Sequence, residues 1–272
     1  MSDSLLPPPP IALTIAGSEA TGGAGAQADL KTFQARGVFG IAALTCIVSF
    51  DPKAQWGHRF VPVDPQVIAD QLEVEFACYT MDAVKVGMLG TPATIDTVAG
   101  VLGEQRPKQL LLDPVLICKG QEPGAALDTD LALQKQVLPL ATFVTPNQFE
   151  AMSLSGLAAI DTVEQLIEAA RIIHERSGAV VLAKGGVRMA GPDAIDVFYD
   201  GQTTEVLSEP KIGEVAVSGA GCSLAAAVTA ELAKGATPLE AARAAKTFIT
   251  QGIRARVASA APFDALWQGG PA

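Results

Sequence analysis

Between residues 11 and 183, short apolar runs alternate with stretches of helical periodicity, and this alternation limits the possible folds more than any other feature of the sequence. The runs are continuously apolar, which is typical of parallel strands buried on both faces. The pattern predicts an α/β fold in which a doubly wound, mainly parallel sheet carries helices on both faces, in three layers. The predicted strands lie at 11–16, 41–48, 82–86, 109–113, 142–145 and 179–183, and the predicted helices between them at 26–36, 65–78, 92–104, 129–138 and 162–176.

The pattern changes after residue 190. Two β-like runs, 194–199 and 203–208, flank Asp200-Gly201, a dipeptide that favours tight hairpin turns, so we expect an antiparallel edge of the sheet there. Two alanine-rich helices are predicted to follow, at 220–234 and 238–256.

The amino-terminal end differs in composition from the rest. Residues 7–10 are consecutive prolines, which favour an extended polyproline conformation, and 1–10 are predicted to be a disordered lead-in to the first strand. The remaining residues, 11–272, fit a single domain because one layered sheet can hold a core of this size. Hydrophobic residues make up 49% of the chain against 18% charged residues, so apolar material for such a core is available.

The net charge, the hydropathy and the cysteines of the sequence indicate which partners and which cellular location to expect. The net charge of −10 and the lack of a basic stripe in the sequence disfavour a nucleic-acid partner. No window approaches the ~18 consecutive apolar residues of a membrane span, and the start of the chain does not read as a leader, so a cytoplasmic protein without a membrane partner is expected. The four cysteines form no CxxC pair and are expected to be reduced, with Cys46 and Cys78 as buried structural thiols.

A glycine-rich segment opens the first of the two alanine-rich helices. It places Gly219, Ala220, Gly221 and the amide of Cys222 at the helix start, where free N–H groups and the helix dipole favour an anion such as phosphate. The same position predicts a lowered thiol pKa, which would suit Cys222 to be a base or a nucleophile. The alternative is a glycine-rich loop beside a small buried thiol.

A second glycine-rich segment offers a rival interpretation. Residues 23–28 match the GxGxxA fingerprint of dinucleotide-binding enzymes, which would make the protein an oxidoreductase. In that fingerprint the first glycine closely follows the strand, whereas here 17–22 intervene, and the nearest acidic residue, Asp51, comes later than expected. The match is therefore weak, and no P-loop motif is present.

Polar side chains follow three further predicted strands. Asn147 and Glu150 are three residues apart at a predicted helix start, where they could hold a hydrated Mg²⁺, although a capping box would use the same residues. Asp113 and Lys184 each end a strand. Because open α/β sheets bind ligands at the carboxyl ends of their strands, these residues are predicted to meet in one crevice.

The order of these motifs resembles the ribokinase superfamily, and within it the bacterial hydroxymethylpyrimidine kinases and the pyridoxal kinases built on the same template. The resemblance spans about 11–258. It rests on the opening AGSEATGGAGAQADLKTF, on GML at 87–89, DPVLICKG at 113–120, TPNQFE at 145–150, AKGG at 183–186 and GAGCS at 219–223. It implies a ribokinase-like fold with a small β flap, a homodimer as the common state, and phosphoryl transfer from ATP with Mg²⁺.

The resemblance also implies roles for individual residues. Cys222 is implied to be the catalytic base, beside an anion hole formed by Gly219, Ala220 and Gly221. Lys184 is implied to contact ATP phosphate, and Asp113 to shape the electrostatics of the metal site. Asn147 and Glu150 are implied to bind Mg²⁺ and the phosphates. The implied substrate-binding residues are Ser18, Glu19, Gly25, Met88 and Cys118, with His58 in the covering flap.

Details of the motifs favour one substrate class. The flap FDPKAQWGHRF and the segment DPVLICKG are more similar to pyridoxal kinases, so we expect a vitamin B6 vitamer as the acceptor, with hydroxymethylpyrimidine or its phosphate as the alternative. A thiol at Cys118 could add to the aldehyde of pyridoxal, unless it is simply a small buried residue. Glu19 stands where the family usually has Asp, and Val217-Ser218 where it usually has Thr-His. A non-catalytic nucleotide-binding protein is a remote third possibility.

Overall fold

A nine-stranded sheet forms the centre of the molecule and orders its strands β3-β2-β1-β4-β5-β6-β7-β8-β9. The computed structural model describes residues 7–116 and 123–269. From β2 to β7 the neighbouring strands are parallel, while β3 at one edge and β8 and β9 at the other are antiparallel. The strands are β1 (Ile11–Glu19), β2 (Phe39–Asp51), β3 (Gly57–Pro62), β4 (Ala83–Val86), β5 (Leu110–Leu112), β6 (Phe143–Val144), β7 (Val180–Gly186), β8 (Asp193–Tyr199) and β9 (Thr204–Pro210).

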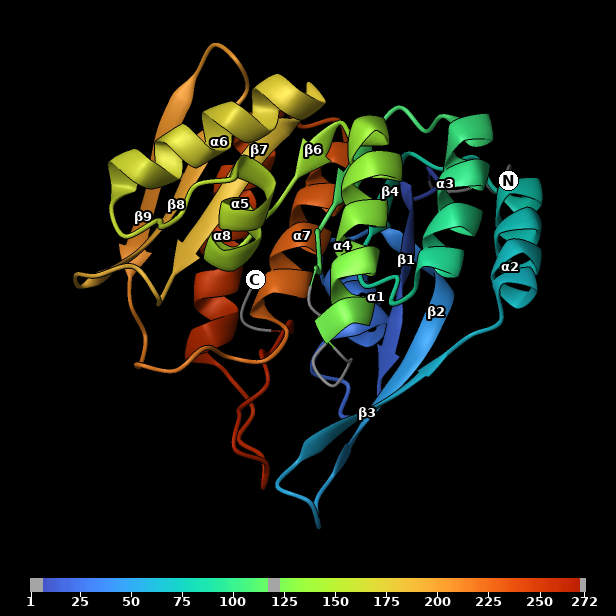
Figure 1. Ribbon diagram of the computed structural model, residues 1–272, viewed down its shortest axis with the longest axis horizontal. Helices are drawn as coiled ribbons and strands as arrows, with labels where there is room; N and C mark the ends of the chain where they lie inside the picture. Colours follow the sequence, from blue (N-terminus) through green and yellow to red (C-terminus); the bar gives the residue numbers. More distant parts are fainter. Residues whose placement is uncertain (1–6, 117–122, 270–272) are drawn as a thin grey trace, which may run out of the picture.

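Helices cover both faces of this sheet, as Figure 1 shows. One face packs against the larger apolar core and carries α2 (Pro65–Cys78), α3 (Pro92–Gln105), α4 (Pro123–Gln136), α5 (Gln148–Ser155) and α6 (Val163–Ser177), with a 3-10 turn at Leu138–Leu140. The other face carries α1 (Gly25–Ala35), α7 (Ala220–Ala233) and α8 (Pro238–Arg254). The predicted three-layer, mainly parallel α/β fold is confirmed.

Local sequence signals explain where several helices begin and end. Thr162 and Thr237 each begin a helix with a capping box, in which the hydroxyl and a side chain three residues later satisfy free N–H groups. Gly156 and Gly178 end α5 and α6 in the left-handed conformation that glycine adopts most easily. The hairpin at Asp200-Gly201 joins β8 to β9 and gives the antiparallel edge that the sequence predicted.

β2 is longer than the strand that the sequence predicted. The sequence predicted a strand over 41–48, whereas β2 runs on to Asp51 and pairs with β3, so that the two form the flap that projects at the bottom of Figure 1. The polar residues of β3 carry no clear periodicity, which is why the sequence indicated a flap but no strand bounds. α4 likewise begins at Pro123, six residues before the predicted start at 129.

The cysteines differ from expectation at one position. Cys46 is buried in β2, but Cys78 is exposed at the end of α2, so its predicted burial is wrong. The apolar pattern of α2 continues to its last turn, where Phe76 packs against the core while Cys78 lies on the exposed side. Within the described ranges, no helix is both long enough and apolar enough to cross a membrane.

Candidate active site

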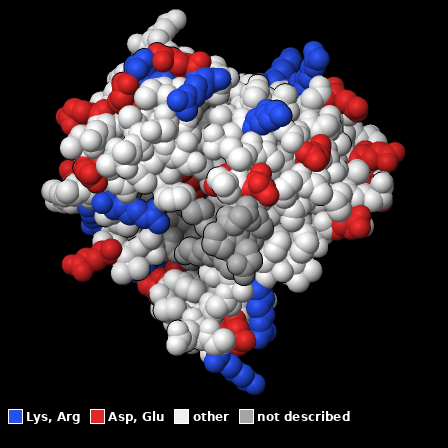
Figure 2. All heavy atoms as spheres, viewed as in Figure 1, with Lys and Arg blue, Asp and Glu red and all other residues white. Residues whose placement is uncertain are grey.

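Two cavities open at the carboxyl ends of the parallel strands, each of about 260 Å³. The first, here called the β1–β4 cavity, lies where the chain order of the sheet reverses between β1 and β4, the position at which open α/β sheets bind ligands. The second, here called the β7–α8 cavity, lies between the end of β7 and α8. On the face seen in Figure 2, Lys and Arg side chains are spread among Asp and Glu rather than gathered into one basic area.

The β1–β4 cavity collects most of the predicted substrate-binding residues. Glu19, Gly25, His58 and Met88 line it, together with Cys222. Ser18 does not, because successive side chains of a strand point to opposite faces and its neighbours Gly17 and Glu19 face the cavity. Cys118, which was also predicted to bind the substrate, lies outside the described residues. The remaining lining residues are Ala16, Gly17, Ala24, Val48, Phe50, Lys85, Gly87, Val115 and Ser218.

Glu19 uses its carboxylate to hold the loop that follows β1. One oxygen accepts a hydrogen bond from the backbone N–H of Thr21 at 2.7 Å, and the other accepts from the Thr21 hydroxyl at 2.7 Å and from the N–H groups of Gly23 and Ala24 at 3.2 Å. Four donors nearly exhaust the acceptor capacity of a carboxylate. Glu19 therefore shapes the wall of the cavity through its backbone loop more than through a free carboxylate.

Gln27 ties the start of α1 to the same strand end. Its amide oxygen accepts from the backbone N–H of Glu19 at 3.0 Å, and its amide nitrogen donates to the Ser18 hydroxyl at 2.6 Å. The Ser18 hydroxyl is thereby fixed outside the β1–β4 cavity. Sequence reasoning missed Gln27, because its contacts depend on how α1 packs against β1.

The flap covers the β1–β4 cavity with aromatic side chains. Phe50 on β2 and His58 on β3 meet edge to face, with ring centroids 4.7 Å apart, and both line the cavity. Phe263, from the segment after α8, packs against Phe50 at 5.2 Å. Phe50 was not predicted as a site residue, although its place at the start of the flap, directly after an apolar strand, was a usable signal.

The start of α7 lies between the two cavities. Ala220 and Gly221 line the β7–α8 cavity, whereas Cys222 lines the β1–β4 cavity. Gly219 caps the helix with φ of 78°, and a Cβ there would collide with the carbonyl oxygen of Gly23. This close approach, open only to glycine, packs the loop before α7 onto the loop before α1. The free amides of the first turn consequently lie where both cavities can reach them.

Burial opposes the chemistry that the helix start alone would favour at Cys222. The sequence predicted a lowered thiol pKa, but burial raises the pKa of Cys222 to about 11, while Lys85 and the N–H of Gly25 act in the opposite direction. The helix-end argument is local, whereas the surroundings of this sulfur come from α1 and β4. Without a ligand the thiol is therefore protonated at neutral pH.

The β7–α8 cavity has a charged end and an apolar wall. Lys184, Arg188 and Asn147 lie at the charged end, beside Gly221 of α7. The wall includes Val187, Ile212, Val217, Leu224, Ile249 and Ile253. The unusual pair Val217-Ser218 is thus divided between the cavities, with Val217 facing this one and Ser218 facing the β1–β4 cavity.

Lys184, Asp113 and Glu150 form one electrostatic cluster at the strand ends. The Lys184 ammonium lies 2.8 Å from Asp113 Oδ1, which also accepts a hydrogen bond from the Thr145 hydroxyl at 3.1 Å. Burial raises the pKa of Glu150 to about 7, with Lys184 opposing and Asp113 reinforcing the rise. Asn147 and Glu150 form the capping box of α5, the alternative that the sequence left open. The predicted convergence of the strand ends is therefore present.

The same cluster has the chemistry of a magnesium site. Mg²⁺ takes oxygen ligands, commonly one or two carboxylates completed by phosphates and water, and Asp113 and Glu150 are carboxylates with Lys184 as the neighbouring cation. Within the described ranges, no group of three or more His, Cys, Asp or Glu side chains could hold a metal by itself. The residues fit a magnesium ion that is shared with a phosphate ligand.

The comparisons with known proteins agree with this geometry. The family model described as phosphomethylpyrimidine kinase matches residues 19–263. The chain belongs to the phosphomethylpyrimidine kinase family. Its fold is the ribokinase-like fold that the sequence resemblance implied. Membership in this kinase family also leaves the weak GxGxxA match at 23–28 without a dinucleotide-binding role.

The chain is also similar to individual kinases that act on vitamin B6 compounds, according to their names. It is 47% identical over 243 residues to a pyridoxine kinase of Bacillus subtilis, covering 89% of this chain and 90% of that one. The structure of the pyridoxal kinase of Bacillus subtilis with ADP has a TM-score of 0.92 at 44% identity, covering 97% and 98% of the two chains. A pyridoxal kinase from Staphylococcus aureus in complex with AMP-PCP and pyridoxal has a TM-score of 0.89 at 37% identity, covering 97% and 94%.

Proposed function

We propose that this protein transfers the γ-phosphoryl group of ATP to the hydroxymethyl group of a vitamin B6 vitamer, namely pyridoxal, pyridoxine or pyridoxamine. The observation that carries the proposal is the position of α7, whose first turn faces the β7–α8 cavity through Gly221 and the β1–β4 cavity through Cys222. A phosphate bound at the free amides of this turn would lie between a ligand in one cavity and a ligand in the other.

ATP is assigned to the β7–α8 cavity. Lys184 and Arg188 supply positive charge for the phosphates, and the apolar wall formed by α8 and the loop before α7 suits a flat base. Structures of related pyridoxal kinases with ADP and with AMP-PCP support a nucleotide in this fold.

The vitamin ring is assigned to the β1–β4 cavity. Phe50, Met88 and Val115 offer apolar contacts, while Lys85, His58 and Ser218 offer polar ones, a mixture that suits a substituted pyridine. A related kinase has been solved in complex with AMP-PCP and pyridoxal, which supports separate sites for a nucleotide and a vitamin in this fold. The same cavity could admit hydroxymethylpyrimidine or its phosphate, the phosphomethylpyrimidine after which the family is named, and these are the alternative substrates.

A magnesium ion would be held by Asp113 and Glu150. Its contribution when bound is neutralisation of the charge on the phosphate oxygens. Lys184 would position the γ-phosphate and share that charge, since its ammonium already lies 2.8 Å from Asp113. The first-turn amides of α7 would donate to the transferring oxygens, and these donors are fixed by the fold before the substrate arrives.

Cys222 would act as the base. Phosphoryl transfer has a loose transition state, so positioning and charge neutralisation dominate and the proton of the alcohol is needed late. The bond between the hydroxymethyl oxygen and phosphorus forms while the bond from phosphorus to the bridging oxygen of ADP breaks. The alcohol proton then passes to the sulfur of Cys222, which faces the ring cavity.

A competition assay tests the substrate. Purified protein is incubated with Mg-ATP and equal concentrations of pyridoxal and hydroxymethylpyrimidine, and both monophosphates are quantified by mass spectrometry. We expect pyridoxal 5′-phosphate to form faster. Faster formation of the pyrimidine phosphate would overturn the substrate assignment and leave a kinase, whereas turnover of neither vitamin would favour a nucleotide-binding protein without catalysis.

We further propose that the protein forms a homodimer through an apolar surface on β2, β3 and α2. Ile47 and Val61 lie opposite each other in the register of β2 and β3 and are 43% and 61% exposed, and Val74 on α2 is 61% exposed. Exposed apolar side chains on neighbouring elements are typical of an interface. Sedimentation analysis should give a dimer that the substitution Val61→Asp weakens, and a concentration-independent monomer would contradict this.

A cytoplasmic location is also proposed, because the donor is ATP and the described cysteines Cys46, Cys78 and Cys222 are free thiols. Fractionation of cells followed by detection of the protein with an antibody would test it, and recovery outside the cytoplasmic fraction would refute it.

A further inference from the structure

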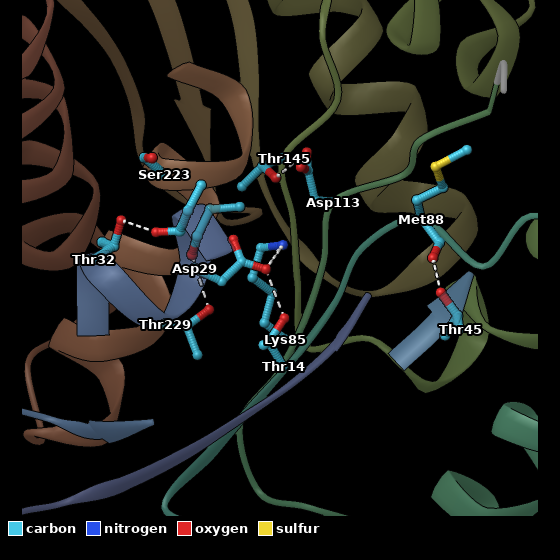
Figure 3. A network of polar contacts seen from close by, with 12 residues as sticks. Thr14, Asp29, Thr32, Thr45, Lys85, Met88, Asp113, Thr145, Ser223 and Thr229 are labelled. Atoms are coloured by element: carbon cyan, nitrogen blue, oxygen red, sulfur yellow. Dashed lines mark hydrogen bonds and ion pairs between the residues drawn. The ribbon is translucent and has the colours of Figure 1, made fainter. Parts of the chain in front are cut away.

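A buried ion pair lies directly below the candidate active site. The Lys85 ammonium on β4 lies 2.9 Å from Asp29 Oδ2 on α1, and the two side chains are 1% and 0% exposed. The Thr14 hydroxyl on β1 donates to the same carboxylate oxygen at 2.6 Å. Figure 3 shows the three side chains turned toward one another between these elements. Apolar residues of the same size would often give equal stability, so such a pair invites a functional explanation.

Lys85 reaches the active site from this pair. It lines the β1–β4 cavity with Cys222, and a Cβ on Gly87 would lie only 3.1 Å from its ammonium nitrogen, so the glycine leaves that nitrogen room at the cavity wall. Cys222 accepts a hydrogen bond from the N–H of Gly25 at the start of α1. The sulfur therefore has an amide donor on one side and an ammonium group nearby.

Four charged groups act on the Cys222 sulfur from the surrounding elements. Asp29 on α1 and Asp113 after β5 disfavour a thiolate, while Lys85 on β4 and Lys184 on β7 favour one. Burial is the largest influence and raises the pKa of Cys222 to about 11, and Lys85 is the strongest influence in the opposite direction. Lys184 is bound to Asp113 and is assigned to the ATP phosphates. Lys85 is therefore the cation with the larger influence on the sulfur and, unlike Lys184, it is not assigned to a phosphate.

We propose that Lys85 is a positioning residue for the proton transfer: its ammonium group, held by Asp29, stabilises the Cys222 thiolate that accepts the proton of the substrate alcohol. This rests on the proposed function. In the step itself the thiolate becomes a thiol, the alcohol oxygen gains phosphorus, and ADP leaves with the electron pair of the broken bond. The step leaves Cys222 as the thiol, which is its resting form, and this thiol must lose its proton to solvent before the next transfer. Lys85 keeps its own proton throughout.

The ion pair also keeps Lys85 from reacting with an aldehyde. Burial alone would lower the pKa of Lys85, yet Asp29, Cys222 and Asp113 hold it above its ordinary value. A protonated amine is no nucleophile, so pyridoxal in the β1–β4 cavity does not condense with Lys85. The Lys85–Asp29 pair thus keeps a positive charge beside pyridoxal while Lys85 forms no covalent bond with its aldehyde.

Alkylation of Cys222 tests the proposal without any need for turnover. The rate of carbamidomethylation of Cys222 by iodoacetamide is measured by peptide mass spectrometry between pH 7 and 9, in the wild type and in the Lys85→Met/Asp29→Asn double variant. The double variant removes both charges and so avoids leaving Asp29 buried alone. Asp29, which the double variant also removes, opposes the thiolate less strongly than Lys85 favours it. We therefore expect slower alkylation at every pH, by about tenfold for each unit that the thiol pKa rises.

Thr14→Val is the matched control, since it removes a hydrogen bond from the same buried network but leaves both charges in place. It should lower the thermal midpoint and keep the wild-type alkylation profile. Equal alkylation of the wild type and a folded double variant, with circular dichroism as the measure of folding, would overturn the role of Lys85. If the alkylation rates differ as expected but neither vitamin is phosphorylated, the proposed function fails and the stabilisation of the thiolate stands.

Discussion

At the scale of single residues, the candidate site is governed by charges that the fold holds out of water. Asp113 is buried and shares one oxygen between Lys184 and Thr145, and Lys85 and Asp29 are paired below the neighbouring cavity. A buried charge costs free energy unless it has a partner, and a ligand of opposite charge adds to that arrangement. Removal of one partner should therefore have effects well beyond the lost contact.

Lys184→Met should weaken the use of ATP. The variant removes the cation assigned to the phosphates and leaves Asp113 without its ion-pair partner, so kcat/KM for ATP should fall by about 10²–10³. Lys108→Met is a suitable control, because Lys108 is exposed before β5, at the opposite end of that strand from Asp113. Equal ATP kinetics in both variants would contradict the assignment of the β7–α8 cavity.

Sequence reasoning at this scale succeeded for residues that follow strands. Asp113, Asn147, Glu150 and Lys184 were predicted to meet at one edge, and the parallel sheet brings them there. The sign of the Cys222 pKa shift was wrong, because burial depends on packing that the helix start does not reveal. Lys85 was missed, although a lysine inside a four-residue apolar strand was a signal of a buried charge.

At the scale of elements, the site depends on how closely the start of α7 approaches the start of α1. Gly219→Ala should abolish most activity, because its Cβ would collide with the Gly23 carbonyl and displace the first-turn amides. Gly235→Ala is a matched control at the other end of α7, since its φ of 89° is equally strained for alanine but open space surrounds it. That control should lose about 1 kcal/mol of stability and keep its activity.

Equal loss of activity in both glycine variants, measured as kcat at saturating substrates, would mean that backbone strain rather than the collision matters. In that case activity would depend less on the exact position of the first turn of α7 than we propose.

α2 carries a carboxylate that should make stability depend on pH. Burial raises the pKa of Glu75 from 4.5 to about 7, and Glu75 Oε2 is buried with no hydrogen-bond partner among the described residues. The folded state therefore holds a proton that the unfolded state loses first, so Glu75 contributes its stability below its unfolded pKa and loses that contribution as the pH rises through its folded pKa. Glu75→Gln should accordingly be more stable than the wild type at pH 8 but not at pH 4.

Thermal midpoints at the two pH values check this prediction, with Glu73→Gln on the exposed side of the same helix as the control. A gain for Glu75→Gln that is the same at both pH values would show that the carboxylate does not titrate in this range.

The elements themselves were predicted unevenly, for a physical reason. Long buried strands and amphipathic helices carry a periodic pattern, so β1, β7, α6 and α8 lie close to where the sequence placed them. β3 carries no such pattern, because it is a mostly exposed antiparallel strand whose place is set by pairing with β2. The resemblance therefore indicated a flap that carries His58, whereas the bounds of β3 and the contact of Phe50 with His58 could not be predicted from the residues.

At the scale of the whole molecule, the sheet order explains why residues far apart in the sequence share one site. Six parallel strands end at the same edge, and the reversal of chain direction between β1 and β4 opens the β1–β4 cavity. α7 then inserts its first turn between this cavity and the β7–α8 cavity. The alternation of strands and helices was enough to predict the edge, but the division into two cavities needed the packing of α7 against α1.

The central claim is that Cys222, at the start of α7, serves phosphoryl transfer between ligands in the two cavities. The most direct test compares initial rates of pyridoxal 5′-phosphate formation by the wild type and by Cys222→Ala at saturating Mg-ATP and pyridoxal, with nucleotide affinity measured by calorimetry. We predict that kcat falls by about 10²–10⁴ in the variant while the affinity for nucleotide is unchanged. Near-normal turnover by Cys222→Ala would contradict the account.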